Sequence, residues 1–359
     1  MATSGSFDFV LNRNELIDTA LRTLNVISVG ETPDDDVYTH AARKLNMMLK
    51  AWQADGLHLW HKKRVSVFLR KDQSVYRLEN ASTGDRFTFD WMLPQAGTVK
   101  EGVSFTTQAG ATQTMGRTEI NNSSGEVAGE TSLTVDSTTN MTASDNIMIE
   151  LDNGVAHWTT ISSVTDSTTV VIASAIPTDR TGNDDAEVYW YTARAERPLR
   201  ILPEHAWVTT PADGTERPVR VISSEEFWRL SNKTSDGAVA EVYYDPQLSP
   251  GNLYVFPQSD SSTEVLNFIA EYPVEDMDSD TDDFDIDHEW FLAVELGLAV
   301  LLSIQNGITG RQYEELLGQA LTEKQRVMGF DHENTSVFIH PAEEWTSEGG
   351  MGFRGSYGR

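Results

Sequence analysis

The sequence NRNELIDTALRTLNVISVGETPDDDVYTHAARKLNMMLKAWQADG, residues 12–56, decides most of the fold prediction, because both of its halves carry clear helix signals. The first half predicts a helix over Asn14–Leu24, with apolar side chains three and four residues apart on one face. In the second half, Thr32-Pro33-Asp34-Asp35-Asp36 has the N-cap residue, first-turn proline and carboxylates of a helix start. The helix that follows has an apolar stripe and ends at Gly56, so residues 12–56 predict a helical hairpin.

Two further helices are expected near the other end of the chain, over Trp290–Ile304 and Arg311–Met328. We expect the four helices to pack through these apolar side chains: Leu16, Leu21, Leu45, Met48, Trp52, Trp290, Leu298 and Leu317. The predicted class is therefore α+β, with a helical-bundle core built from the N- and C-terminal helices and an all-β region inserted between them.

The middle of the chain is rich in Thr, Ser, Gly and Val and predicts short strands separated by turns. Asp152-Asn153-Gly154, for example, predicts a hairpin turn between Ile147–Leu151 and Trp158–Ile161. The expected division is a helical hairpin at 1–70, a β connection at 71–96, an inserted small β-barrel or sandwich at 97–191, a β-rich region at 192–275, C-terminal helices at 276–330 and an extended tail at 331–359.

Composition limits the possible classes of protein. A chain of 359 residues with 39% hydrophobic content is long enough for two or three domains with buried cores. Because it contains no cysteine, disulfides, thiolate metal sites and thiol catalysis are excluded. We expect neither a signal peptide nor a membrane span, since the first twenty residues lack the required pattern and the longest apolar run is short and contains Glu295.

The formal net charge of −28 is unevenly distributed along the chain. Residues 1–70 carry a net +1, whereas residues 271–359 carry −14. Affinity for nucleic acid comes from clustered Lys and Arg, so this balance argues against ordinary DNA or RNA binding. Lys62, Lys63 and Arg64 form one basic cluster, which we interpret as a solvated strand entry or a contact with an acidic neighbour or DNA.

One acidic stretch was tested as a calcium loop. Asp278, Asp280, Asp282 and Glu289 fall at positions one, three, five and twelve of the EF-hand pattern. Asp283, however, occupies the position at which the loop needs glycine. A solvated acidic loop leading into a helix explains the run better, so we expect no metal and no other cofactor.

The sequence contains none of the common nucleophile, phosphate-binding or zinc-protease motifs, and we expect no enzymatic activity. With 55 Asp and Glu residues, a glycosidase-type carboxylate pair stays open as an alternative. Trp158, Trp190 and Tyr191 could line a sugar-binding face in the inserted region, although packing in a β core is the favoured interpretation.

Several segments on both sides of the inserted region occur in an informative order: Glu15–Leu24, Ala41–Leu57, Arg197–Ile201, Asn232–Thr234, Tyr243–Pro246 and Glu289–Ala299. In this order they resemble the head-to-tail adaptors of short-tailed bacteriophages, also called tail accessory factors or packaged-DNA-stabilisation proteins. The resemblance covers about half of the chain. The inserted region at 97–191 departs from the family pattern and looks like an addition to it.

The resemblance implies a structural part of a virion neck, assembled in the cytoplasm of the host bacterium. Its expected partners are the portal protein, a tail nozzle or tail-tube protein, and further copies of itself in a ring, with twelve as the implied number. Double-stranded DNA would pass through the ring without sequence-specific binding. Tail fibres or other tail proteins are possible partners of the insertion. The alternative function is a cell-wall (peptidoglycan) hydrolase or a carbohydrate-binding tail protein.

The last residues, Pro341–Arg359, show no periodicity and predict a tail that orders only against a partner. Aromatic and arginine side chains along it are suited to portal docking: Trp345, Phe353, Arg354, Tyr357 and Arg359. The alternative is a dispensable terminus.

Overall fold

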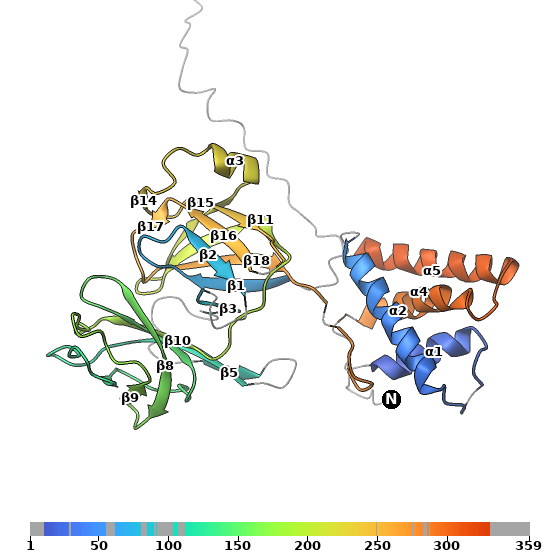
Figure 1. Ribbon diagram of the computed structural model, residues 1–359, viewed down its shortest axis with the longest axis horizontal. Helices are drawn as coiled ribbons and strands as arrows, with labels where there is room; N and C mark the ends of the chain where they lie inside the picture. The colour runs from blue at the N-terminus through green and yellow to red at the C-terminus, as the bar shows by residue number, and fades with distance from the viewer. Residues whose placement is uncertain are drawn as a thin grey trace, which may run out of the picture.

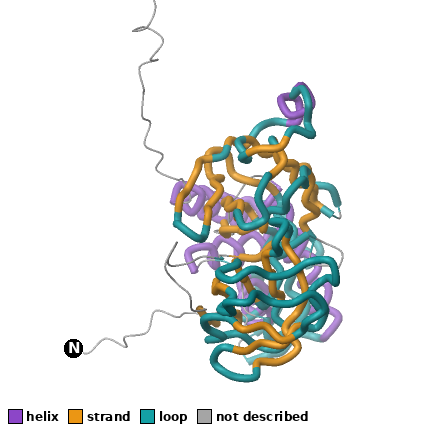
Figure 2. The backbone as a smooth tube through the Cα atoms, turned by 90° about the vertical axis from the view of Figure 1, so that its left-hand side faces the viewer, coloured by secondary structure: helices purple, strands orange, loops and turns teal. Residues whose placement is uncertain are grey.

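The computed structural model describes residues 11–28, 30–54, 62–79, 85–89, 91, 103–106, 112–248, 250–274, 276–282, 286 and 288–330. Helices gather on one side of the molecule and sheets on the other (Figure 1). Viewed with the sheets in front, the two sheet regions lie one above the other and most of the helices lie behind them (Figure 2). None of the helices within the described ranges is long and apolar enough to cross a membrane.

The helical side consists of α1 (Arg13–Thr23), α2 (Asp35–Ala54), α4 (Phe291–Ser303) and α5 (Arg311–Phe330). These helices lie where their periodicity predicted them. Helix α1 begins with a capping box, in which the Glu15 backbone N–H donates to Asn12 Oδ1 at 2.9 Å and the Asn12 N–H donates to the Glu15 carboxylate at 3.1 Å. A short 3₁₀ turn, His288–Trp290, precedes α4.

Helix α4 contacts α1, α2 and α5. Its approach to α2 depends on Gly297, where an added Cβ atom would lie 2.8 Å from Met48 Sδ and 3.0 Å from the Trp52 ring. The four helices, with parts of the segment before α4, form one buried group that we call the helical cluster: Leu16, Ile17, Ala20, Leu21, Leu24, Ala41, Ala42, Leu45, Met48, Leu49, Trp52, Val274, Met277, Ile286, Trp290, Phe291, Ala293, Val294, Leu298, Ala299, Leu302 and Val327.

A second body, the β body, is built from strands on both sides of the inserted region. Its five-stranded sheet has the order β12-β11-β18-β1-β3, and its four-stranded sheet has the order β13-β15-β16-β2. The strands are β1 (Lys62–Phe68), β2 (Val75–Leu78), β3 (Phe87–Phe89), β11 (Arg200–Thr210), β12 (Thr215–Pro218), β13 (Arg220–Val221), β15 (Glu241–Asp245), β16 (Gly251–Phe256) and β18 (Val265–Glu271). Helix α3 (Ser224–Arg229) projects from its far end, beside the pair β14 (Asp236–Gly237) and β17 (Gln258–Ser259) (Figure 1).

The third region is a curved sheet of order β4-β5-β10-β7-β8-β9-β6. Its strands are β4 (Val103–Thr106), β5 (Thr112–Glu119), β6 (Ser132–Thr134), β7 (Asn146–Glu150), β8 (Ala156–Val164), β9 (Thr169–Ile172) and β10 (Glu187–Tyr191). The predicted hairpin is confirmed, since β7 pairs with β8 and Gly154 adopts a φ of +71° in the turn. A bridge between Ile120 and Val135 brings the ends of β5 and β6 together, so the sheet curls round its own core.

An aromatic cluster joins the curved sheet to the β body. Phe68 lies at its centre, with ring centroids 5.0 Å from Trp91 and 5.2 Å from Tyr191. A hydrogen bond also joins the two parts, since the Tyr189 hydroxyl donates to the Thr263 carbonyl at 2.9 Å. The curved sheet is therefore packed firmly against the β body through both apolar and polar contacts.

The predicted fold class is wrong. Among the described residues, 33% are strand and 26% are helix, and the strands form several sheets including a half-barrel. The helices make one cluster at the side of the molecule, while separate buried cores fill the β body and the curved sheet. The difference has a physical reason: a long amphipathic helix is visible in local periodicity, whereas the sheets depend on pairing between strands far apart in the sequence.

Candidate interaction surface

Helix α5 has more apolar surface than its neighbours cover. Of its described residues only Ala320 and Val327 are buried, although the stripe that contains them extends over the whole helix. Leu317 is half-buried, Leu321 is 51% exposed and Met328 is 39% exposed. Because these three residues are spaced by four and seven positions, they lie on one side of the helix. We call them the α5 apolar face.

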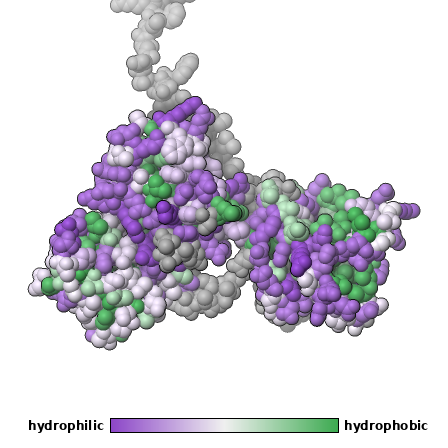
Figure 3. All heavy atoms as spheres, in the orientation of Figure 1, coloured by the Kyte–Doolittle hydropathy of each residue, from purple (hydrophilic) through white to green (hydrophobic). Residues whose placement is uncertain are grey.

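Apolar side chains are also exposed at the C-terminal end of α4. Apart from Glu295 and Ser303 this helix is made of apolar residues and glycine, which is typical of a helix buried on most sides. Leu301 is nevertheless 43% exposed and Ile304, its C-cap residue, 67% exposed. Hydrophobic side chains accordingly gather on the surface of the helical side (Figure 3). Covering one leucine contributes about 1.5–3 kcal/mol, so a partner that packed here would gain substantial stabilisation.

The polar side of α5 offers little binding energy of its own. Arg311 and Glu315 form an exposed ion pair at 2.7 Å, and Arg326 and Glu323 form another at 2.6 Å. Exposed pairs of this kind contribute about 0–1 kcal/mol and are screened by salt. Lys324 instead places its ammonium 4.7 Å from the centre of the Trp52 ring, which ties α5 to α2.

Most of the residues expected to pack the helices are buried between them. Seven of the eight belong to the helical cluster: Leu16, Leu21, Leu45, Met48, Trp52, Trp290 and Leu298. The exception is Leu317, which is half-buried and contributes to the α5 apolar face. The docking residues proposed for the tail, Trp345, Phe353, Arg354, Tyr357 and Arg359, lie outside the described residues.

The candidate calcium ligands are not brought together. Asp282 Oδ2 accepts the backbone N–H of Ser279 at 2.6 Å, which closes a local turn, and Asp280 accepts from the Ser279 hydroxyl. Glu289 belongs to the separate 3₁₀ turn before α4. Within the described ranges no group of three or more His, Asp or Glu side chains is placed to hold a metal ion.

The aromatic residues considered for sugar binding have a structural role. Trp190 and Tyr191 are fully buried, and Trp158 is half-buried with its ring 5.1 Å from Phe68. None of the three presents an open ring face of the kind on which a sugar stacks. The β core packing that the sequence favoured is therefore the observed arrangement.

The basic cluster at the start of β1 contacts aromatic rings. Lys63 lies 5.4 Å from the centre of the Phe89 ring, and the Arg64 guanidinium lies 5.3 Å from that of Trp207. Both side chains lie over aromatic rings of the β body and stay partly exposed, and the solvated entry and the contact with an acidic neighbour or DNA remain predictions.

In the curved sheet a buried arginine, Arg117, forms ion pairs with two carboxylates. Arg117 on β5 donates through Nε to Glu187 on β10 at 2.7 Å and through Nη2 to Glu119 at 2.7 Å. Burial raises the pKa of Glu187, while the hydrogen bond and charge of Arg117 act in the opposite direction. The Arg117–Glu187 pair therefore ties β5 to β10, while Glu119, on the same strand as Arg117, adds a second acceptor to the guanidinium.

Sequence reasoning missed the polar side of α2. Asn46, Lys50 and Gln53 all contact the backbone of the segment that leads from β18 to α4. Their spacing of four and three residues was the available signal, because it places them on one side of the helix next to the apolar stripe.

Comparison of the chain with known protein families and with curated proteins finds no match.

Proposed function

We propose that the protein is a structural adaptor subunit of a short-tailed bacteriophage, joining the portal to the tail as one member of a ring. The α5 apolar face is the observation that carries this proposal. A subunit that leaves Leu321 and Met328 uncovered on a partly packed helix gains stability when another protein surface covers them. The kind of assembly is inferred from the segments that, in their order along the chain, resemble the adaptor family.

A ring is the form of assembly that fits a helix packing against a different surface of the next copy. Such head-to-tail contacts close into a ring when the rotation between copies is a whole fraction of a turn. In the proposal α5 contributes one side of this contact, and the ring extends the DNA channel beneath the portal.

The charge of the chain is compatible with a channel for DNA. A net charge of −28 repels phosphates, so a duplex that passed through an acidic ring would stay mobile. The same charge opposes spontaneous closure of the ring. We therefore expect the isolated protein to be monomeric or weakly associated, and to assemble on a portal ring. A stable large ring in light scattering without portal, in physiological salt, would contradict this.

The decisive experiment replaces the exposed apolar side chains of α5 by carboxylates. The variant Leu321→Asp/Met328→Asp should stay folded and keep its circular dichroism spectrum, since both side chains are partly exposed and neither belongs to the helical cluster. It should fail to form rings on purified portal, as judged by sedimentation and negative-stain images. Leu248→Asp, at a residue 93% exposed in the β body, is the matched control and should assemble normally. Normal assembly of the α5 variant would disprove the role of this face.

Docking to the portal is proposed to involve the C-terminal tail, whose glycines and aromatic residues suit an extended path. Many weak tails around one ring would act together through effective concentration. Deletion of Thr346–Arg359 should leave the melting temperature unchanged and abolish attachment to portal-bearing heads. Attachment that persists after the deletion would assign docking to another surface.

A further inference from the structure

The described residues 272–274 and 276–282 lie between the β body and the helical side and pass along α2. We call them the strap. Gln53 Nε2 donates to the Tyr272 carbonyl at 3.0 Å, and Lys50 Nζ donates to the Val274 carbonyl at 2.6 Å. Asn46 holds Met277 from both directions, since its Oδ1 accepts the Met277 N–H at 3.2 Å and its Nδ2 donates to the Met277 carbonyl at 3.5 Å.

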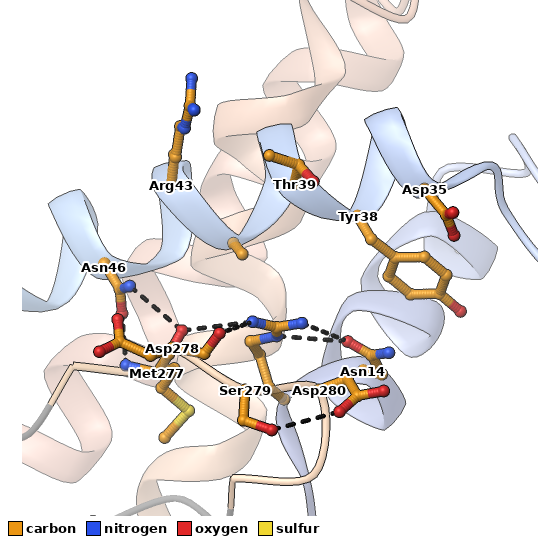
Figure 4. A pocket seen from close by; sticks show the side chains of 12 residues that line it. Asn14, Asp35, Tyr38, Thr39, Arg43, Asn46, Met277, Asp278, Ser279 and Asp280 are labelled. Carbon is orange, nitrogen blue, oxygen red and sulfur yellow. Dashed lines mark hydrogen bonds between the residues drawn. The ribbon is translucent and has the colours of Figure 1, made fainter.

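A second helix holds the far end of the strap. Arg13, the first residue of α1, donates through Nη1 to the Asp278 carbonyl at 2.9 Å, and its backbone N–H donates to the Asp282 carbonyl at 3.0 Å. Figure 4 shows Asn46 on α2 directed at Met277 of the strap, with dashed lines for the hydrogen bonds that join them. An ion pair of Lys50 with Asp276 at 3.0 Å adds a side-chain contact.

The strap also places apolar side chains in both bodies. Tyr272 is 2% exposed and belongs to the core of the β body, where its ring lies 5.0 Å from that of Phe89. Val274 is 1% exposed and Met277 is 3% exposed, and both belong to the helical cluster. Within a few residues the strap therefore leaves one core and enters the other.

All of these hydrogen bonds from α2 join a side chain of the helix to a main-chain group of the strap. Asn46, Lys50 and Gln53 bond main-chain groups of Tyr272, Val274 and Met277, none of which is in a strand, so they satisfy polar groups that a sheet would otherwise pair. Because main-chain groups are fixed relative to the chain path, these bonds determine where the strap runs along α2. A linker held in this way transmits the orientation of one body to the other.

We infer that the strap is a rigid coupler that fixes the helical cluster in one orientation relative to the β body, with Asn46, Lys50 and Gln53 as positioning residues. Each body has its own buried core, so loss of these contacts leaves both folded and frees the angle between them. The inference concerns a single chain and does not depend on the proposed ring.

The test measures a distance between the bodies in the full-length chain. Since the chain has no cysteine, Gln319→Cys on α5 and Glu216→Cys on β12 can be spin-labelled without removing native thiols. Both residues are exposed. Pulsed electron paramagnetic resonance should give one narrow distance distribution for this labelled parent. In Asn46→Ala/Lys50→Ala/Gln53→Ala the distribution should become at least about twofold wider, with the circular dichroism unchanged, because a freed joint samples more angles.

The matched control is Lys44→Ala/Met47→Ala, which changes side chains on another side of α2 and should keep the narrow distribution. Lys50→Arg retains a cationic donor and should also keep it. If the triple variant loses helical signal, Lys50→Ala alone replaces it in the comparison and should still widen the distribution. A narrow distribution in a folded strap variant, or a broad one in the labelled parent, would overturn the inference. Ring formation is not measured, so failure here leaves the proposed function untouched.

Discussion

The helical side and the curved sheet treat their large apolar side chains in opposite ways. In the curved sheet Trp190 and Tyr191 are fully buried, and the strand ends meet in a bridge, so little of the core is left open. On the helical side Leu321 and Ile304 are more than half exposed. The curved sheet therefore covers its large apolar side chains within one chain, whereas the helical side leaves some of them exposed.

The difference between the two regions follows from how helices and strands form their main-chain hydrogen bonds. A helix makes its backbone hydrogen bonds internally, so α5 can keep its shape with one side of its stripe uncovered. A strand needs neighbours for every main-chain bond, and an exposed apolar edge invites aggregation. A strand therefore depends on neighbouring strands for its bonds, while a helix can present an apolar face to another protein.

The largest loss of stability is expected at the aromatic cluster that joins the curved sheet to the β body, when the ring at its centre is removed. Phe68→Ala should lower the free energy of unfolding by about 3–5 kcal/mol, because Phe68 is 1% exposed and large-to-small changes leave a cavity. Denaturant titration followed by tryptophan fluorescence measures the loss. Leu321→Ala on the α5 apolar face is the control and should change stability by less than about 0.5 kcal/mol. Equal losses in the two variants would remove the contrast between the regions.

Two glycines on adjacent helices sharpen the comparison within the helical side. Gly297→Ala should destabilise the protein by about 1–3 kcal/mol, less the helix-propensity gain of alanine, because its Cβ would collide with Met48 and Trp52. Gly318→Ala on α5 has nothing within 4 Å of its Cβ and should stabilise by up to about 1 kcal/mol. Thermal unfolding of both variants gives the two signs. A stabilising Gly297→Ala would show that α2 and α4 are less tightly packed than the structure indicates.

The smallest expected effect concerns a carboxyl in the curved sheet. Glu126 is 2% exposed and accepts the Thr134 N–H at 2.7 Å, and burial raises the pKa of its carboxyl. The folded state then keeps this proton to a higher pH than the unfolded state does. Stability should therefore fall as pH rises through the window between the ordinary glutamate pKa and the raised value.

Glu126→Gln keeps the acceptor for Thr134 and removes the ionisation. The variant should show a flatter dependence of unfolding free energy on pH in that window, measured by urea titration at a series of pH values. Glu225→Gln, at an exposed carboxylate on α3, serves as the comparison and should keep the slope of the parent. An unchanged slope in Glu126→Gln would mean that this carboxyl does not hold its proton in the folded state.

Local patterns predicted several elements to within a few residues. The positions of α1, α4 and α5 follow from apolar spacing, and the turn at Gly154 follows from its sequence. These features depend on contacts between residues close in the chain. The fold class depended on how the strands pair, and there the prediction failed: β1 pairs with β18, some two hundred residues away, and no local pattern contains that partner.

By itself the sequence determined the helices, their apolar stripes, the acidic balance of the chain and the absence of thiol chemistry, because each of these is a property of nearby or summed residues. Only the tertiary structure decided which stripes are covered, so that Leu298 is buried in the helical cluster while Leu321 stays exposed. It likewise decided that Asn46, Lys50 and Gln53 hold the strap and that Trp190 faces a core. Burial and hydrogen-bond partners depend on segments that meet from distant parts of the chain, and that meeting is fixed only when the whole chain has packed.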